Sequence, residues 1–195
     1  MRKSARPFVV GLGGTTRPGS SSERLARLAL SLAEAMGAET QHFNAEALSL
    51  PIYVPEVRER TGAARAFVDA VRRADGLIVV SPGYHGGISG LIKNAIDYLE
   101  DLRDDERPYL EGRAVGCVVA ASGWQATTTT LTALRSIVHA LRGWPTPLGV
   151  AANQSLPLWT DDGELADREL RAQIEIVARQ VVDFAHAQIA ARAPA

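Results

Sequence analysis

The chain has 195 residues, 46% hydrophobic and 22% charged, a composition typical of a globular domain. It contains 21 basic and 22 acidic side chains, and the formal net charge of −1 excludes the strongly basic surface of most nucleic-acid-binding proteins. Cys117 is the one cysteine, which excludes an intrachain disulfide and a cysteine-rich zinc site and fits a reducing compartment.

No targeting or membrane segment is indicated by the sequence. The basic residues between positions 2 and 6 precede an apolar stretch, 8–12, that is too short for a secretory signal. All apolar runs fall far below the ~20 residues that a membrane span needs. We therefore expect a single domain over residues 1–195, located in the cytoplasm, with no membrane or nucleic-acid partner and no metal.

Short apolar runs alternate along the chain with longer segments whose apolar residues recur at helical spacing. In the first half the sequence predicts a strand at 8–13, a helix at 23–36, a strand at 38–43, a loop at 44–62, a helix at 63–74 and a strand at 76–81. The second half continues with a loop at 82–87, a helix at 91–102, a connector at 103–112, a strand at 114–121, a loop at 122–128, a helix at 131–141, a strand at 146–152, a loop at 153–163 and a helix at 167–189.

This alternation of five strands and five helices predicts an α/β fold, with a parallel sheet covered by helices on both faces. Five strands fit the flavodoxin-like three-layer sandwich, with strand order 2-1-3-4-5. Ligands of such sheets bind outside the carboxyl ends of the strands, where the strand order switches. This rule selects the loops after the first, third and fourth strands.

The first selected loop, 13–22, joins a buried strand to a helix and combines glycines, five hydroxyl side chains and Arg17. A helix N-terminus favours an anion, and hydroxyls and arginine donate to phosphate oxygens. The pattern therefore favours a phosphate site over a polar turn with a serine cap, because a cap needs only one hydroxyl. A dinucleotide fingerprint fails, since Thr16 stands at its third glycine, and no Gly-Lys-Ser/Thr is present for a P-loop.

The second selected loop, 81–90, carries four glycines with Tyr84 and His85, so its main chain can lie along a flat polar ring. His85 has no carboxylate or nucleophile at a motif spacing, and we interpret it as a turn residue rather than a catalytic base. The third loop, 121–128, opens with a Ser-Gly pair, and its Trp124 either flanks a flat ligand or packs within the fold.

Together these loops resemble those of the NADPH-dependent FMN reductase family of flavodoxin-like flavoproteins. The family's first loop, Gly-Ser-x-Arg-x-x-Ser-x-Asn, is similar to residues 14–22, with Thr15 and Ser22 in place of its first serine and its asparagine. Its second loop, Pro-Glu-Tyr-Asn-Gly-Ser, is similar to residues 82–87, from which Gly83, His85 and Gly87 depart. The helix that follows it, Leu-Lys-Asn-Ala-Ile-Asp, is similar to 92–97. Trp124 replaces a glycine of the third loop, and the resemblance spans about residues 9–150.

The resemblance implies an oxidoreductase with FMN as cofactor and NADPH or NADH as cosubstrate, in which the flavin does the chemistry and no side chain is catalytic. It implies that the FMN phosphate is held by Thr15, Arg17, Ser20 and Ser22. It implies that the isoalloxazine lies between two groups of residues, which are Pro82, Gly83, Tyr84, His85, Gly86 and Gly87 on one side and Ser122, Gly123 and Trp124 on the other.

The resemblance also implies a homodimer or homotetramer. We expect association through the helix at 91–102, whose apolar Ile92, Ile96 and Leu99 would otherwise be ordinary core residues. The same residue pattern leaves the electron acceptor open. Reduced FMN could supply a partner monooxygenase, or the flavin could stay bound and reduce a quinone, an azo dye or a metal oxyanion.

Three other functional classes fit the sequence less well. A flavodoxin-like electron carrier would normally have an acidic recognition surface, which a net charge of −1 disfavours. A hydrolase of the α/β class needs a Gly-x-Ser-x-Gly elbow, and the chain has none. A receiver domain needs clustered aspartates after the first strand, where this chain has glycines.

Overall fold

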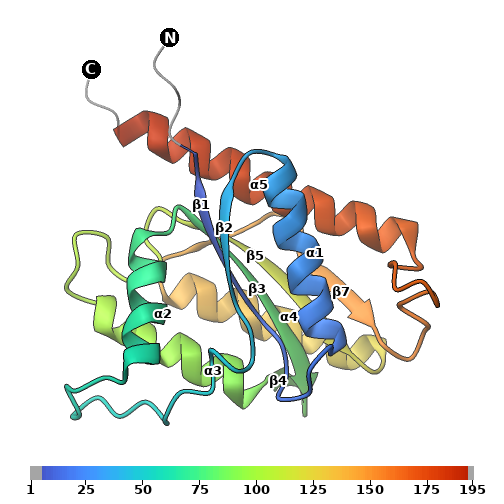
Figure 1. Cartoon of the computed structure of the whole chain (residues 1–195), viewed down its shortest axis with the longest axis horizontal. Coiled ribbons are helices and arrows are strands. Elements are labelled where there is room, and N and C mark those ends of the chain that lie inside the picture. The colour runs from blue at the N-terminus through green and yellow to red at the C-terminus, as the bar shows by residue number, and fades with distance from the viewer. Residues whose placement is uncertain (1–5, 193–195) are drawn as a thin grey trace.

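The computed structural model describes residues 6–192, so the basic residues at positions 2 and 3, on which the targeting prediction partly depends, lie outside the described range. The strands are β1 (Phe8–Gly13), β2 (Glu39–Phe43), β3 (Gly76–Tyr84), β4 (Gly87–Ile88), β5 (Ala114–Ala121), β6 (Trp144–Pro145) and β7 (Val150–Asn153) (Figure 1). The helices are α1 (Ser21–Ala35), α2 (Gly62–Arg73), α3 (Gly90–Asp97), the 3-10 helix η1 (Tyr98–Leu102), α4 (Trp124–Ala140) and α5 (Arg168–Arg192).

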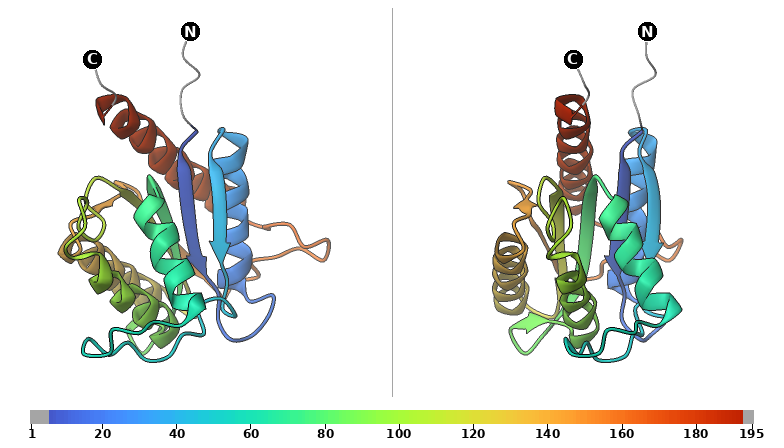
Figure 2. Two further views of the ribbon diagram at one scale, coloured as in Figure 1. Left: turned by 60° about the vertical axis from the view of Figure 1, so that its left-hand side comes forward. Right: turned by 90° about the vertical axis from the view of Figure 1, so that its left-hand side faces the viewer.

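The strands form one sheet in the order β2-β1-β3-β5-β6, with β7 also paired to β5. Each of these strands runs parallel to its neighbour in the sheet. The short strand β4 lies outside this order and pairs antiparallel with the end of β3. The predicted order 2-1-3-4-5 is confirmed, with β5 in fourth place and β6 and β7 sharing the fifth. In Figure 2 the arrowheads of β1 and β2 point down, toward the first loop in blue.

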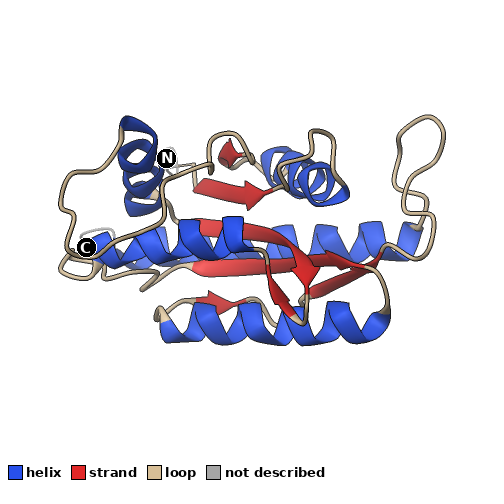
Figure 3. Cartoon of the chain, turned by 90° about the horizontal axis from the view of Figure 1, so that it is seen from below, coloured by secondary structure: helices blue, strands red, loops and turns tan. Residues whose placement is uncertain are grey.

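The sheet is the middle layer of three, with helices on both sides of the strands (Figure 3). Helices α1 and α5 pack on one face, in a core that includes Leu25 and Ile174. Helices α2, α3, η1 and α4 cover the other face, in a core that includes Phe67 and Leu134. The central strand β5 is buried along its whole length, as expected for a parallel strand covered on both faces. This arrangement leaves the carboxyl ends of the central strands open at one end of the sheet.

Three predicted boundaries are wrong for identifiable reasons. Helix α4 begins at Trp124 rather than at residue 131. The threonines in its first turns are compatible with a helix because their hydroxyls donate hydrogen bonds to backbone carbonyls of the same helix. Thr127 donates to Trp124 O at 2.9 Å, for example. The predicted strand at 146–152 begins only at residue 150, as β7, and β6 precedes it at the residues predicted to end a helix. Between the two, Arg135 donates to Thr146 O at 2.6 Å and Gln180 accepts from Leu148 N at 3.3 Å, in place of strand partners.

The third wrong boundary is the end of β3. The predicted strand stops at residue 81, but β3 continues through Pro82, Gly83 and Tyr84 and turns back as β4. Sequence signals for a loop were strong here because proline and glycine are rare inside strands. The strand persists because Gly83 and Tyr84 pair with the two residues of β4 as a hairpin at the sheet end.

The apolar stripe proposed for association lies inside this chain's own core. Ile92, Ile96 and Leu99 are 0%, 6% and 1% exposed. The prediction that these three residues form a subunit interface is therefore wrong, and the alternative of ordinary core packing holds. Within residues 6–192, no helix combines the length and apolar character needed to cross a membrane.

Candidate functional site

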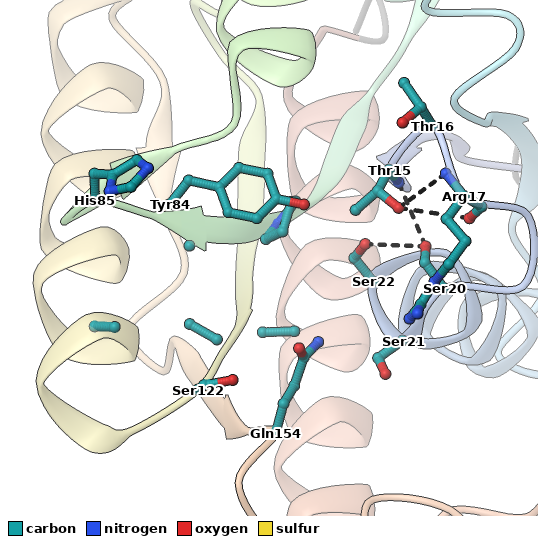
Figure 4. A pocket seen from close by; sticks show the side chains of 15 residues that line it. Thr15, Thr16, Arg17, Ser20, Ser21, Ser22, Tyr84, His85, Ser122 and Gln154 are labelled. Atoms are coloured by element: carbon teal, nitrogen blue, oxygen red, sulfur yellow. Dashed lines mark hydrogen bonds between the residues drawn. The ribbon is translucent and has the colours of Figure 1, made fainter.

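A cavity of about 600 Å³ lies at the carboxyl ends of the strands, where the three loops selected by the strand-order rule meet (Figure 4). Nine of the residues assigned from the sequence line it, namely Thr15, Arg17, Ser20, Ser22, Pro82, Gly83, Tyr84, His85 and Ser122. Six further lining residues were not assigned, namely Thr16, Ser21, Ala120, Ala121, Ala126 and Gln154. Gly86, Gly87, Gly123 and Trp124 do not line it.

Hydrogen bonds within the first loop determine which hydroxyls are available to a ligand. Ser20 is the N-cap of α1, and its Oγ accepts from Glu23 N at 3.3 Å and from Thr15 N at 3.4 Å. With both lone pairs engaged, the Ser20 proton points to Ser22 Oγ, 3.3 Å away (Figure 4). The Ser22 hydroxyl then has its own proton left to donate. Ser20 therefore builds the loop, and Ser22 presents a donor.

Charge in this loop is arranged to favour an anion. Gly19 N donates to Glu23 Oε2 at 3.0 Å, and Arg27 pairs with the same carboxylate at 2.8 Å. The Arg27 hydrogen bond holds the pKa of Glu23 below its usual range, so this carboxylate is ionised but neutralised by its partner. The Arg17 guanidinium makes no hydrogen bond or ion pair with any residue between 6 and 192. The positive charge of Arg17, next to the positive end of the α1 dipole, is thus available to pair with an anion.

The β3–β4 hairpin forms the wall opposite the first loop. His85 and Gly86 occupy its two-residue turn with φ of 52° and 83°, the signature of a type I′ turn. The structure thus places His85 in a turn, as interpreted from the sequence. The Tyr84 ring extends across the cavity toward Thr15, whereas His85 lies on the far side of Tyr84 from the first loop (Figure 4).

The third loop is tied to the end of the neighbouring strand. Asn153 Oδ1 accepts from Gly123 N at 2.8 Å and from Ser155 N at 3.0 Å. Trp124 is 60% exposed and lines a separate cavity of about 510 Å³ beside β7, together with Asn153 and Leu156. Neither Trp124 nor Gly123 lines the first cavity, so their place beside the flavin ring stays a prediction.

Residues 7–156 match the family model for NADPH-dependent FMN reductase. The chain belongs to this family. It is 30% identical over 132 residues to an FMN-dependent NADPH-azoreductase of Staphylococcus haemolyticus, a match covering 67% of this chain and 66% of the relative, just under two thirds of its length.

Solved structures show the same fold. A flavoenzyme NAD(P)H:(acceptor) oxidoreductase from Paracoccus denitrificans superposes with a TM-score of 0.72 at 16% identity, covering 94% of this chain and 99% of that one. A WrbA-like flavodoxin protein from Agrobacterium tumefaciens gives 0.62 at 17% identity, with 94% and 99% covered. At these identities the likeness establishes the flavodoxin-like fold alone.

For a member of the FMN reductase family, the cavity holds few groups that could transfer protons. Its ionisable side chains are Arg17, Tyr84 and His85. Cys117 lies in the sheet, where burial raises the pKa of its thiol to about 12, so it is not a nucleophile near neutral pH. Within residues 6–192, no three His, Cys, Asp or Glu side chains gather to hold a metal ion.

The unassigned lining residues differ in how far the sequence could have revealed them. Thr16 and Ser21 lie within the hydroxyl-rich loop, and counting hydroxyls there would have included both. Gln154 follows β7, outside the three selected loops, and reaches the cavity because Gln154 N donates to Ala121 O at 2.8 Å. No local pattern marks it.

Proposed function

We propose that this protein is an NAD(P)H-dependent FMN reductase whose cavity of about 600 Å³ holds FMN. The observation that carries the proposal is one cavity with two different ends. A loop rich in hydroxyls and bearing Arg17 lies at the start of α1, and the main chain of the β3 end and the β5–α4 turn lies opposite. These ends match a phosphate and a flat polar ring.

The phosphate end has donors of three kinds. Ser21 and Ser22 offer hydroxyl protons, Arg17 offers an uncommitted guanidinium, and the start of α1 offers its positive dipole end. Thr15 and Ser20 are engaged with the loop itself, where Thr15 Oγ1 accepts from Arg17 N at 3.2 Å. We assign these two residues to shaping the loop around the phosphate.

At the ring end, Pro82, Gly83 and Tyr84 offer strand backbone, and Ser122 offers a turn at the opposite wall. When bound, FMN accepts hydride from the nicotinamide and passes electrons to an acceptor. The chain contributes by orienting the ring between β3 and the β5–α4 turn and by holding the phosphate. With no carboxylate lining the cavity among residues 6–192, we assign no side chain to proton transfer.

Binding measurements test this proposal directly. Fluorescence quenching should show tighter binding of FMN than of FAD, since the donors of the first loop are gathered in one group, as a single phosphate requires. Purified protein should oxidise NADPH when FMN is supplied. Tighter binding of FAD, or of neither flavin, would refute the proposal.

Substitution of Arg17 by alanine separates phosphate binding from ring binding. A charge-assisted hydrogen bond contributes about 1.5–3 kcal/mol, so Arg17→Ala should weaken FMN by about ten- to hundredfold. Riboflavin, which lacks the phosphate, should bind the variant and the wild type equally. Equal losses for both ligands would mean that the loop had collapsed, and no loss for either would mean that Arg17 is only a solvated residue.

An azo compound is a second candidate for the electron acceptor, and it is favoured by the relative named an azoreductase. A partner monooxygenase that receives reduced FMN is the alternative. NADPH oxidation measured with an azo dye, with and without free FMN added, distinguishes these routes. Dye reduction without free FMN supports a bound flavin that passes electrons directly.

Self-association is also a proposal, and its surface combines the loop before α2 with Lys93 and Asp97 of α3, which line the cavity beside that loop. Ile52 and Val57 are 78% and 51% exposed on the loop before α2, beside an open cavity of about 440 Å³ between Tyr53 and Ile137. Replacing Ile52 with glutamate should lower the apparent mass in size-exclusion chromatography if this loop forms the contact. A single domain and a cytoplasmic location stay predictions from the sequence.

A further inference from the structure

The turn at residues 158–166, between β7 and α5 (orange, Figure 1), lies beyond the region that matches the family model, yet it contacts the first turns of α1. It forms a tight turn, in which Gly163 N donates to Thr160 O and Thr160 N to Glu164 O, both at 2.9 Å. A bridge between Trp159 and Leu165 closes it. This turn carries Trp159 at its base.

Two contacts fasten this turn to the first turns of α1. The Arg24 guanidinium lies 3.8 Å from the centre of the Trp159 ring, a cation–π contact. Arg24 also donates to Gly163 O at 2.7 Å. The indole is therefore held between α1 and its own turn, with its N–H directed at the helix start.

The third contact reaches the cavity itself. Trp159 Nε1 donates to Ser21 Oγ at 3.4 Å, and Ser21 lines the cavity. An oxygen that accepts from an indole N–H turns its own proton away from that donor. No residue between 6 and 192 accepts the Ser21 proton, so it is left for a ligand at the phosphate end.

We propose that Trp159 is a positioning residue that aims the Ser21 hydroxyl proton at the FMN phosphate, and that Arg24 holds Trp159 in place. The inference rests on the proposed function, because it assigns the ligand of this hydroxyl. The selectivity of the site for FMN over riboflavin then depends partly on a turn outside the matched region.

A double-mutant cycle on flavin affinity tests this coupling. Ser21→Ala removes one hydroxyl bond to a charged group and should weaken FMN about tenfold. Trp159→Phe keeps the ring and removes only the N–H, and should weaken FMN about threefold, because a neutral hydrogen bond that orients the hydroxyl is lost. Riboflavin binding should stay unchanged in both. In the Ser21→Ala background, Trp159→Phe should have no further effect.

Two further variants make the result decisive. Trp144→Phe makes the same change at an exposed tryptophan next to Phe184, away from the cavity, and should bind FMN as the wild type does. Arg24→Met releases the turn and should reproduce the loss seen for Trp159→Phe, which keeps the test valid if that variant folds poorly.

The outcomes separate this inference from the proposed function. Wild-type protein that does not prefer FMN over riboflavin would refute the proposed function. Wild-type preference for FMN with unchanged affinity in Trp159→Phe and Arg24→Met would overturn the inference alone. Losses that are equal for riboflavin, or that persist in the Ser21→Ala background, would overturn it as well, because Trp159 would then act on the loop and not through Ser21.

Discussion

Gly83→Ala should destabilise the protein at the wall of its own cavity. A Cβ at Gly83 would lie 2.8 Å from Ala121 Cβ and 2.8 Å from Thr130 Oγ1. Ordinary carbon–carbon contacts lie near 3.5–4.0 Å, so the new methyl group would be about 0.7 Å too close. The family residue here is glutamate, and α4 leaves no space for it.

The loss of stability in Gly83→Ala depends on which of the neighbouring groups can move. Ala121 has no alternative rotamer and is fixed in β5, so the β3 end or the backbone of α4 must shift. Thr130 can rotate, but its hydroxyl then leaves Gly87 O, 3.4 Å away. Inserting a methyl group into such a contact typically costs about 1–3 kcal/mol. For a chain of this size, a loss of about 2 kcal/mol lowers the Tm by about 4–8 °C.

Denaturant unfolding of Gly83→Ala against Gly87→Ala measures this effect. Gly87 lies in the same hairpin, and a Cβ there would meet no atom within 4 Å, so its substitution should cost less than about 0.5 kcal/mol. Adding Thr130→Ala to Gly83→Ala should restore part of the lost stability, since one of the two short contacts disappears. If Gly83→Ala is as stable as Gly87→Ala, then α4 does not pack on the hairpin as described.

Three further substitutions test other parts of the structure. His85→Asn should stabilise by about 0.5–1 kcal/mol in thermal unfolding, because asparagine tolerates the left-handed turn position better, and a lower Tm would contradict the turn type. Burial lowers the pKa of His42 below 6.5, so the folded state binds fewer protons than the unfolded state. The stability from His42 is complete above pH 6.5 and is lost as the pH falls through the lowered pKa. The stability difference between wild type and His42→Gln should follow this pH dependence, and a pH-independent difference would refute the burial argument. Arg113, 1% exposed, donates to four carbonyls, and Arg107 also serves two of these, Arg72 O and Ala74 O. Arg113→Met leaves the other two carbonyls, Tyr109 O and Glu111 O, without the guanidinium donor, and should lower the free energy of unfolding by about 2–4 kcal/mol in chemical denaturation. An unchanged denaturation midpoint would mean that water replaces the guanidinium as donor.

The sequence by itself predicted the fold that the structure shows and the end of the sheet where the cavity lies. Apolar runs too evenly hydrophobic for a half-exposed sheet predicted buried parallel strands, and strand order then selected three loops. Hydroxyls, glycines and Arg17 in the first loop predicted an anion site there, because hydroxyl and guanidinium groups gain nothing from a buried apolar core. These signals are local in the chain, so a single sequence contains them.

Tertiary structure alone decided which of these side chains are available. Ser20 and Ser22 look alike in sequence, but the N-cap geometry uses up the Ser20 hydroxyl and leaves the Ser22 proton to donate. The stripe of Ile92, Ile96 and Leu99 has the same spacing whether it faces a partner or the core, and only the packing of α3 and η1 into the core buries it. Trp159 meets Ser21 across 138 positions of sequence, a contact that no local pattern encodes. Periodicity indicates which residues share a face, and only the folded chain shows what that face contacts.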